Sequence, residues 1–510
     1  MIAIPREYNA AVDLVERNLA TRARKLAYID DAGEYTFAEL AERVNRFGSG
    51  LGELGLDMED RVLLAMADGI DWPVAFLGAI RAGIIPIAVN TLLTTRDYEY
   101  MLSDSRARAL VVSEALLPQF EPLLGKLRFL KHVIVSGKDA KGHLPFDGIL
   151  KRGKASFRAA PTTSDDACFW LYSSGSTGMP KGTVHVHSSM ALTAELYAKG
   201  VLGMSEADTV FSAAKLFFAY GLGNALSFTL YTGATAVLMG ERPTPASVFR
   251  RWVERKPTIF FGVPTLYAAM LASTDFPKRE QLALRACVSA GEALPPQIGR
   301  SFRERTGVDI LDGIGSTEML HIFLSNRPGA VRPGTTGKPV LGYELRLVDE
   351  QGNPVKQGEL GELQIKGPTH AACYWNNRQK SVATFVGGWT KSGDKYSVDA
   401  DGYYAYGGRS DDMLKVSGIW VSPAEVEAAL VGHDAVLEAA VVGAEDEQKL
   451  VKPKAFVVLK PGQSASDSLK AALQQHVKEK LAPYKYPRWI EFLPELPKTA
   501  TGKIQRFKLR

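Results

Sequence analysis

Short apolar runs alternate with helix-like stretches along the first part of the chain. Residues 61–66 and 84–89 read as buried strands, and residues 71–82 between them read as a helix. Residues 109–113 and 132–136 repeat the pattern around another helical stretch. Strands that are apolar along their whole length and separated by helices are typical of parallel sheets with helices on their faces. The alternation therefore predicts an α/β fold.

The last part of the chain has a different pattern. Ser422 and Glu425 have the spacing of a capping box, with a proline at the first helical position. Further strand-like and helix-like runs follow at residues 439–442, 455–459, 467–481 and 489–493. These runs suffice for a compact α+β module of about a hundred residues.

A chain of 510 residues is too long for one hydrophobic core. The boundary between its parts is expected at residues 406–412, where two glycines beside charged residues suit a hinge. We therefore expect a large region of several subdomains over residues 1–410 and a small mobile domain over residues 411–510.

Composition excludes several classes of protein. The net charge is only +5 and no block of like charge occurs, which argues against a nucleic-acid binder. The three cysteines have neither the spacing of a metal site nor the even number of a disulfide framework. The most apolar region, residues 74–89, is interrupted by Arg81 and Pro86 and is no membrane span. Since the N-terminus also lacks a signal-peptide pattern, a cytoplasmic location is expected.

Residues 172–183, Tyr-Ser-Ser-Gly-Ser-Thr-Gly-Met-Pro-Lys-Gly-Thr, follow a strand-like run at 167–172. Glycines let backbone N–H groups approach an anion, hydroxyl groups add donors, and Lys181 adds a positive charge. The pattern predicts a loop that binds the phosphates of a nucleotide; a flexible Ser/Gly linker is the alternative. The P-loop template of NTPases does not fit, because the fifth residue after Gly175 is Pro180.

Residues 312–318, Asp-Gly-Ile-Gly-Ser-Thr-Glu, form a second candidate binding segment. Its glycines permit close approach of a ligand, and Thr317 and Glu318 supply oxygen atoms. Mg²⁺ prefers one or two carboxylates together with phosphate oxygens. A plain helix N-cap at Ser316 or Thr317 is the alternative.

Several segments of the sequence resemble the motifs of one known family. Residues 173–182 resemble the phosphate loop of the adenylate-forming superfamily, which includes acyl-CoA synthetases, luciferases and peptide-synthetase adenylation domains. Residues 314–318 resemble its Tyr-Gly-x-Thr-Glu motif, with Ile314 where tyrosine is usual, and residues 389–394 resemble Gly-Trp-x-x-Thr-Gly-Asp, with Ser392 for threonine. The hinge motif and the Pro-x-Thr-x-x-Gly-Lys ending follow at residues 408–418 and 497–506.

The resemblance implies roles for single residues. Thr317 would bind phosphate and Glu318 would position magnesium. Asp394 would bind the ribose hydroxyls, where the alternative is a turn aspartate. Arg409 would reach ribose or phosphate, and Lys503 would stabilise charge between the carboxylate and the α-phosphate.

The remaining implied sites are larger sets. The rest of the ATP site would consist of Ser173, Ser174, Gly175, Ser176, Thr177, Gly178, Lys181, Ala290, Gly291, Glu292, Asp312, Gly313 and Ile314. Asp411 would be the pivot of the hinge, and Gly418 and Trp420 would contact coenzyme A.

Residues 215–223, Lys-Leu-Phe-Phe-Ala-Tyr-Gly-Leu-Gly, place aromatic side chains next to small ones. Such walls suit a flat ring, although an aromatic core strand would have a similar composition. Residues 213–224 and 316–326 resemble the benzoate–CoA ligases and their 4-hydroxybenzoate relatives. By that likeness the ring would be surrounded by Ala219, Tyr220, Gly221, Ile314, His321 and Ile322.

The activity that the resemblance implies is ATP-dependent adenylation of an aromatic carboxylate, followed by transfer of the acyl group to coenzyme A. Alternatives are another acid, such as 4-hydroxybenzoate or a medium-chain acid, loading of a separate carrier protein, and a luciferase-like or non-catalytic nucleotide sensor. No nucleic-acid or membrane partner is expected. The sequence does not determine the oligomeric state; relatives are often dimers, which makes a homodimer the alternative to a monomer.

Overall fold

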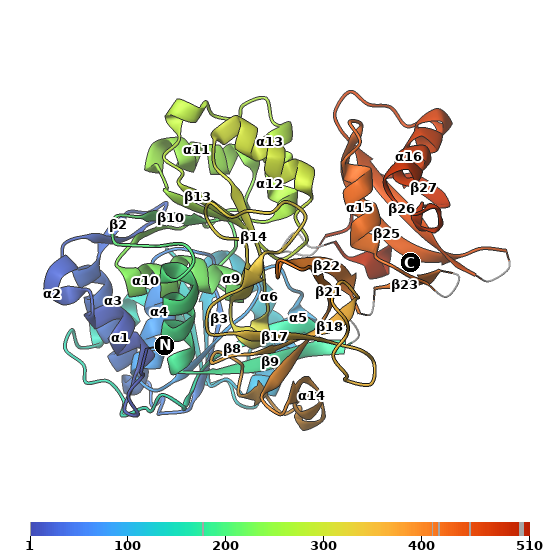
Figure 1. Ribbon diagram of the computed structural model, residues 1–510. Helices are drawn as coiled ribbons and strands as arrows, with labels where there is room; N and C mark the ends of the chain where they lie inside the picture. Colours follow the sequence, from blue (N-terminus) through green and yellow to red (C-terminus); the bar gives the residue numbers. More distant parts are fainter. Residues whose placement is uncertain (1, 176–177, 411, 417–418, 448–449, 499–503) are drawn as a thin grey trace.

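The computed structural model describes residues 2–175, 178–410, 412–416, 419–447, 450–498 and 504–510. Within these residues the large N-terminal region contains an eight-stranded and a nine-stranded sheet. A smaller C-terminal part lies beside it, coloured orange to red in Figure 1. The predicted class, an α/β region of parallel sheets with a small α+β domain, is confirmed.

The eight-stranded sheet confirms the opening prediction. Its centre consists of four parallel strands with the bounds β3 (Arg61–Ala65), β4 (Ile85–Ala88), β5 (Ala109–Ser113) and β6 (His132–Ser136). Helices α3 (Phe37–Glu53) and α4 (Asp71–Arg81) pack closely. A Cβ atom at Gly48 of α3 would lie only 2.6 Å from the carbonyl oxygen of Gly78 in α4, so this approach requires glycine.

The nine-stranded sheet carries one side of the candidate site. Its parallel strands are β11 (Thr235–Val237), β10 (Thr209–Ser212), β12 (Ile259–Gly262), β13 (Ala286–Ser289) and β14 (Ile310–Gly315). Strand β15 (Ile322–Ser325) then pairs with β14 in the antiparallel direction. Three helices lie on the upper side of this sheet in Figure 1: α11 (Pro245–Arg255), α12 (Pro264–Ala272) and α13 (Pro296–Thr306).

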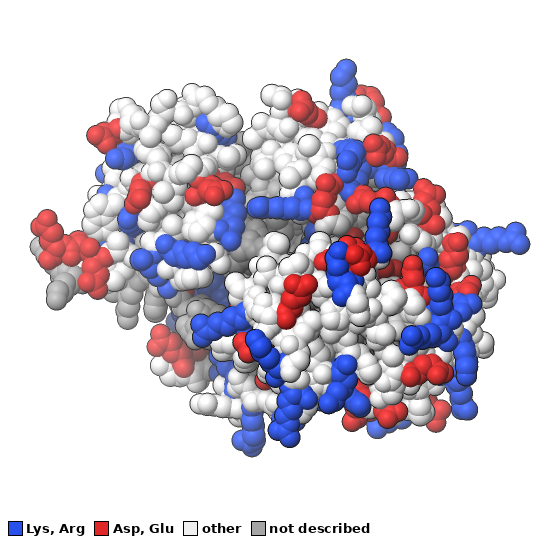
Figure 2. All heavy atoms as spheres, turned by 180° about the vertical axis from the view of Figure 1, so that it is seen from behind, with Lys and Arg blue, Asp and Glu red and all other residues white. Residues whose placement is uncertain are grey.

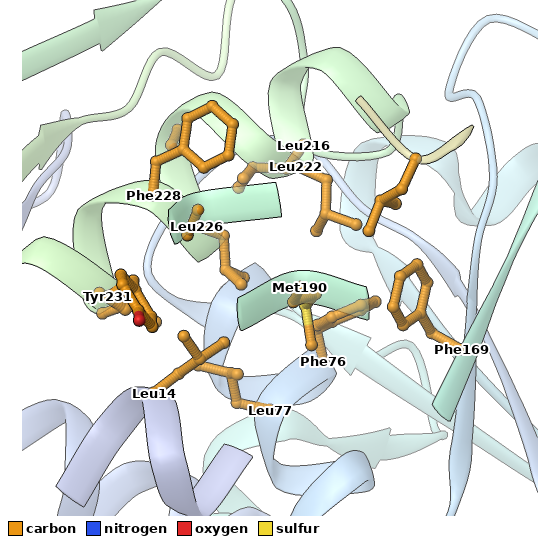
Figure 3. Close-up of a cluster of buried hydrophobic side chains, with 14 of the residues drawn as sticks. Leu14, Phe76, Leu77, Phe169, Met190, Leu216, Leu222, Leu226, Phe228 and Tyr231 are labelled. Carbon is orange, nitrogen blue, oxygen red and sulfur yellow. The ribbon is translucent and has the colours of Figure 1, made fainter. Parts of the chain in front are cut away.

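One apolar cluster joins elements of the two large sheets (Figure 3). Phe76 of α4 and Phe169 of β8 (Ala167–Gly175) come from the eight-stranded sheet and its cover. Leu222 and Phe228 come from a helical segment beside the nine-stranded sheet. All four side chains are buried, so the two sheets share one core and hold a fixed relative position.

A third sheet follows these two. Its antiparallel strands include β17 (Glu344–Val348), β18 (Gly361–Lys366), β21 (Trp389–Val398) and β22 (Tyr404–Arg409). Part of the predicted hinge segment, residues 406–409, is thus a paired strand. Residues 410–413 lie between this strand and the next one, β23 (Leu414–Val416).

The C-terminal part has a core of its own. Strands β25 (Val436–Glu445), β26 (Val451–Leu459) and β27 (Trp489–Phe492) form a sheet, and β23 pairs with β24 (Ile419–Val421). Helices α15 (Pro423–Val431) and α16 (Asp467–Lys480) contribute Val426 and Leu473 to the buried cluster of this sheet. The predicted strands and helices are confirmed within a few residues.

One prediction about this domain is wrong in part. The Ser422 hydroxyl accepts the Glu425 N–H at 3.1 Å, as a capping box requires. The Glu425 carboxylate does not return to the Ser422 N–H but accepts from Lys485 Nζ at 2.6 Å. A charged partner forms a stronger hydrogen bond than a backbone amide, so only half of the capping box is present.

Charged side chains of both signs are interspersed over the face shown in Figure 2. No helix among the described residues is both long enough and apolar enough to cross a membrane. Cys168, Cys287 and Cys373 are free thiols.

Candidate active site

The predicted phosphate segment lies mainly in two paired strands. Strand β8 continues through Gly175, and β9 (Gly178–Val186) returns antiparallel to it, with Ser173 opposite Lys181. The prediction of one loop over residues 172–183 is therefore wrong, because residues 172–175 and 178–183 lie in two paired strands. Ser173 Oγ donates to Glu318 Oε1 at 3.3 Å, so this hairpin contacts the second candidate segment, residues 312–318.

Several predicted site residues fall outside the described part of the chain. They are Ser176, Thr177, Asp411, Gly418 and Lys503. For Ser174, Gly175, Gly178 and Trp420 the structure describes the backbone within strands and no more.

The second candidate segment, residues 312–318, extends from β14 into the turn that follows this strand. Ser316 caps the short 3₁₀ turn Thr317–Met319, and its hydroxyl accepts the Met319 N–H at 3.2 Å. The N-cap alternative is thus confirmed for Ser316. It does not account for Glu318, whose Oε1 accepts hydrogen bonds from Tyr374 Oη at 2.8 Å and from Ser173.

Long-range hydrogen bonds hold the backbone of this turn. His185 Nε2 lies 2.7 Å from the Thr317 carbonyl oxygen, and the Ala371 N–H donates to the Glu318 carbonyl oxygen at 2.7 Å. Burial lowers the pKa of His185 to about 4, so its ring is neutral near pH 7 and donates through Nε2. Besides its own cap at Ser316, the turn is therefore positioned from β9 and from the segment before Tyr374.

Lys181 completes the polar side of the site. Its Nζ lies 4.5 Å from the centre of the Tyr374 ring, close to Glu318. Burial lowers the lysine pKa, and the nearby glutamate opposes this shift. The Lys181 ammonium, the Tyr374 hydroxyl and the Glu318 carboxylate thus lie close together. Such a set suits an anionic ligand that is bound together with its own counter-ion.

Glu318 is suited to a shared magnesium ion. No group of three or more His, Cys, Asp or Glu side chains with metal-binding geometry occurs among the described residues. A single carboxylate supports a Mg²⁺ ion whose other ligands are phosphate oxygens and water. The donor set at Glu318 therefore fits magnesium that arrives with a nucleotide.

Asp394 and Arg409 lie on paired strands. Asp394 of β21 is the register partner of Arg409 in β22, and Arg409 Nη1 lies 3.2 Å from Asp394 Oδ1. Only 7% of Asp394 is exposed. The turn-aspartate alternative is therefore wrong, because the residue lies inside a ten-residue strand.

The candidate ATP-site residues around Gly291 and Asp312 lie at the carboxyl ends of β13 and β14. Ala290 is buried, and Gly291 has a φ of 97°, which favours glycine. Asp312 is buried beside them, and burial raises the pKa of its carboxyl group. Ligands of α/β folds bind at this edge of a parallel sheet.

Glu292 makes a contact that the sequence did not predict. Its Oε1 accepts the backbone N–H of Ile504 at 3.0 Å, across 212 residues of chain. Ile504 directly follows Lys503 in the sequence. The small domain therefore reaches the large region beside the candidate ATP site.

The candidate ring pocket begins at α9 (Ala219–Leu222), so the alternative of an aromatic core strand is wrong. Ala219 and Tyr220 are half-buried and Gly221 is buried. A Cβ atom at Gly221 would lie 2.0 Å from the Lys215 carbonyl oxygen, so only glycine fits there.

The opposite wall of the candidate ring pocket consists of residues that come directly after the Thr317–Met319 turn in the chain. The centre of the His321 ring lies 5.6 Å from that of Tyr220. Ile322 is buried at the start of β15, while Ile314 of β14 is half-buried and packs against the core. Burial lowers the pKa of His321 to about 3, which keeps the ring neutral. The structure thus brings Ala219, Tyr220, Gly221, Ile314, His321 and Ile322 into one region.

Sequence reasoning missed three residues that position others. Tyr374 and His185 hold Glu318 and Thr317, and Asn224 Oδ1 lies 3.1 Å from His321 Nε2. No local pattern marks these residues, because each acts over 56 or more residues of chain.

Comparison with known proteins identifies the family. The profile described as "AMP-binding enzyme" matches residues 15–375, and "AMP-binding enzyme C-terminal domain" matches residues 425–503. The chain belongs to the AMP-binding, adenylate-forming enzyme family.

This AMP-binding enzyme has relatives that align along its whole length. It is 65% identical to the benzoate–CoA ligase of Thauera aromatica, over 100% of this chain and 97% of that protein. It is 50% identical to the 4-hydroxybenzoate–CoA/benzoate–CoA ligase of Rhodopseudomonas palustris, over 99% of this chain and 94% of that protein. A crystal structure of a benzoate CoA ligase from Burkholderia xenovorans LB400 superposes with a TM-score of 0.94 at 56% identity, covering 99% of this chain and 100% of that one.

Proposed function

We propose that the enzyme is an AMP-forming acid–thiol ligase that joins a benzoate-like aromatic carboxylate to coenzyme A. The observation that carries the proposal is the 65% identity, over the whole chain, to a benzoate–CoA ligase. The adjoining polar and aromatic walls around residues 317–322 support it, because they offer a phosphate site next to a ring site.

The chemistry has two steps. A carboxylate oxygen of the acid attacks the α-phosphorus of ATP, the bond to pyrophosphate breaks, and an acyl-adenylate forms. The sulfur of coenzyme A then attacks the acyl carbon, AMP leaves, and the thiol proton passes to solvent. Neither step needs a covalent bond to the protein.

We assign the polar residues to the first step. Thr317 and Lys181 bind phosphate oxygens, and Asp394 binds the ribose hydroxyls through its two oxygens. Glu318, held by Tyr374, would hold magnesium, which neutralises phosphate charge when bound. Charge on the α-phosphate is stabilised by Lys503 and Arg409.

In our proposal the two domains have different roles. Residues 1–410 bind ATP and the acid, and residues 411–510 rotate about Asp411 to present Lys503 for adenylation and Gly418 with Trp420 for coenzyme A. The hydrogen bond from the Ile504 N–H to Glu292 supports the first arrangement, because Ile504 follows Lys503. The unpaired thiols Cys168, Cys287 and Cys373 support a reducing, cytoplasmic location.

An ATP–pyrophosphate exchange screen over aromatic and aliphatic acids tests the proposal. We expect exchange with benzoate and poor exchange with long-chain fatty acids, since a pocket closed by the buried His321 and Ile322 would have no room for a tail. A preference for aliphatic acids would contradict the ring assignment. Thioester formation with free coenzyme A then distinguishes a ligase from an enzyme that loads a carrier protein or a nucleotide sensor.

A further inference from the structure

A buried carboxylate from the eight-stranded sheet holds the chain just before the helix of the candidate ring pocket. Asp68 lies on the loop between β3 and α4 and is 8% exposed. Its two carboxylate oxygens accept the backbone N–H of Leu216 at 3.2 and 3.4 Å, across 148 residues of chain. Leu216 lies between β10 and α9, so this contact joins the two large sheets beside the pocket.

Asp68 is charged near neutral pH although it is buried. Burial raises the pKa of its carboxyl group to about 6, while the Lys215 ammonium and the Leu216 N–H oppose this shift. The group is therefore ionised at pH 7.5. Hydrogen bonds to ionised groups are stronger than neutral ones, and a buried charge is costly unless it is bonded. The Leu216 backbone is thus held by a strong acceptor.

Lys215 anchors the same part of the chain on another side. Its Nζ donates to the carbonyl oxygen of Met239 and, at 2.6 Å, to that of Glu241. Both carbonyl groups lie on the segment between β11 and α11. This segment also meets the loop of Asp68, since a Cβ atom at Gly240 would lie 3.3 Å from the Asp68 carbonyl oxygen. Adjacent residues of one turn are therefore tied to two different sheets.

The anchored turn leads directly into the wall of the candidate ring pocket. The Phe218 N–H donates to the Lys215 carbonyl oxygen at 3.0 Å, and α9 begins at the next residue, Ala219. A Cβ atom at Gly221 would lie 2.0 Å from the same carbonyl oxygen, so the turn and the helix are in direct contact. Packed interiors transmit strain, so a shift of the turn displaces Ala219 and Gly221 as well.

We propose that Asp68 is a positioning residue for the aromatic acid: by holding the Leu216 N–H it fixes the wall of Ala219 and Gly221 and so sets the width of the ring pocket. Lys215 is the second anchor of this wall. Asp68 acts through the backbone of the turn. The proposal rests on the proposed function, which places the ring of the acid beside Ala219 and Gly221.

The test separates binding of the acid from binding of the nucleotide. In Asp68→Ala the Leu216 N–H loses a charged acceptor, so we expect the KM for benzoate to rise about tenfold and the KM for ATP to stay within about twofold. The preference for benzoate over a naphthoate should decrease, because a loosened wall admits a wider ring. Asp68→Asn retains an oxygen acceptor of the same size and should bring the KM for benzoate back towards that of the wild type.

Asp208→Ala is the matched control. Asp208 is also a buried carboxylate, 4% exposed, and it pairs with Arg285, but it lies before β10 whereas Leu216 lies after that strand. Its loss should lower the free energy of unfolding in urea without changing either KM. If Asp68→Ala does not fold, Lys215→Met decides the matter, because it removes the second anchor and should likewise raise the KM for benzoate alone.

The outcomes separate this proposal from the proposed function. An unchanged KM for benzoate, equal increases in both KM values, or no recovery in Asp68→Asn overturns the positioning role of Asp68. Absence of pyrophosphate exchange between the wild type and benzoate overturns the proposed function itself. The same comparison, made with the acid that does support exchange, then tests Asp68.

Discussion

Glu318 and His321 are separated by only two residues, yet they serve opposite faces of one turn. The Glu318 carboxylate accepts hydrogen bonds from Ser173 and Tyr374 in a half-buried polar setting. His321 is 2% exposed and is surrounded by the rings of Tyr220, Phe228 and Tyr197. A single reversal of the chain thus separates a polar, charged environment from an aromatic one.

The reversal occurs at Leu320, which has φ 67° and ψ −43°. Positive φ is unfavourable for a branched side chain, and residues of this kind concentrate at functional sites. Burial of the leucine side chain, which is 2% exposed, compensates for the backbone cost. The strained residue allows its neighbours to face opposite sides.

The two faces also differ in how they are assembled. On the polar face the partners come from β8, β9 and the segment before α14 (Arg378–Thr384), which are remote in sequence. On the aromatic face Tyr220, Asn224 and Phe228 come from one continuous helical segment. Changes on the polar face should therefore affect adenylation, and changes on the aromatic face should affect the choice of acid.

The largest effect is expected from Glu318→Gln, which retains size and hydrogen bonding but removes the charge. Loss of one preorganised electrostatic group lowers kcat by about 10² to 10³. We expect a folded protein whose pyrophosphate exchange is lower by at least this factor, with a weaker dependence on Mg²⁺. Glu344→Gln, which breaks only an exposed pair with Lys366, is the control. An unchanged magnesium profile would reduce Glu318 to a structural residue.

Ala219→Phe should change the other face alone. Overfilling a packed site costs about 1–3 kcal/mol, which corresponds to about 5- to 150-fold in KM for benzoate. The KM for ATP should stay near that of the wild type, because the polar face is untouched. Ala207→Phe, at an exposed alanine, provides the control in steady-state kinetics. Equal changes for both substrates would show that the two faces are not separate.

Tyr374→Phe sharpens the comparison by removing one hydroxyl group. Its hydrogen bond to Glu318 is made to a charged group, so about a tenfold loss in the rate of adenylation is expected. The KM for benzoate should not change, and more Mg²⁺ should be needed for half-maximal exchange. Tyr231→Phe removes a similar hydrogen bond, to Glu195, away from the site and should have no effect on either quantity.

The smallest effect concerns pH and the histidines of both faces. The folded-state pKa values of His185 and His321 are lowered by burial to about 4 and about 3. The unfolded chain takes up protons below about pH 6.5, so stability is complete above this value and decreases as the pH falls towards these pKa values. Between pH 7.5 and 6.0 each histidine should cost about 0.8 kcal/mol of unfolding free energy.

Urea unfolding at the two pH values measures this difference. His321→Phe should remove about one histidine's share of the pH dependence. A slope that His321→Phe does not alter would mean that this ring takes up a proton in the folded enzyme.

Much of the fold could be predicted because it depends on local patterns. The apolar runs of β3 to β6 need only sequence neighbours to be recognised, since a strand buried on both faces is apolar throughout. The glycine, hydroxyl and charged residues of the family motifs likewise occur in continuous segments. These segments include Glu318, Asp394 and the run around Tyr220 that is predicted to bind a ring.

The details that failed depend on partners far away in the chain. Residues 172–183 form a hairpin rather than a loop because β9 pairs with β8. Glu425 bonds to Lys485 instead of completing the capping box. Asp394 lies within a strand because β18 and β22 pair with β21. Strand pairing and ion pairing act through space, so no local window contains them.

By itself, then, the sequence determined the class of fold and the family, and it predicted a nucleotide site and an aromatic pocket, because side-chain types and their spacing carry these properties. Only the tertiary structure decided that Tyr374 and His185 support the turn of Glu318 and that Asn224 orients His321. Hydrogen bonds need atoms within about 3 Å of each other. Residues remote in sequence reach that distance only when the sheets have packed.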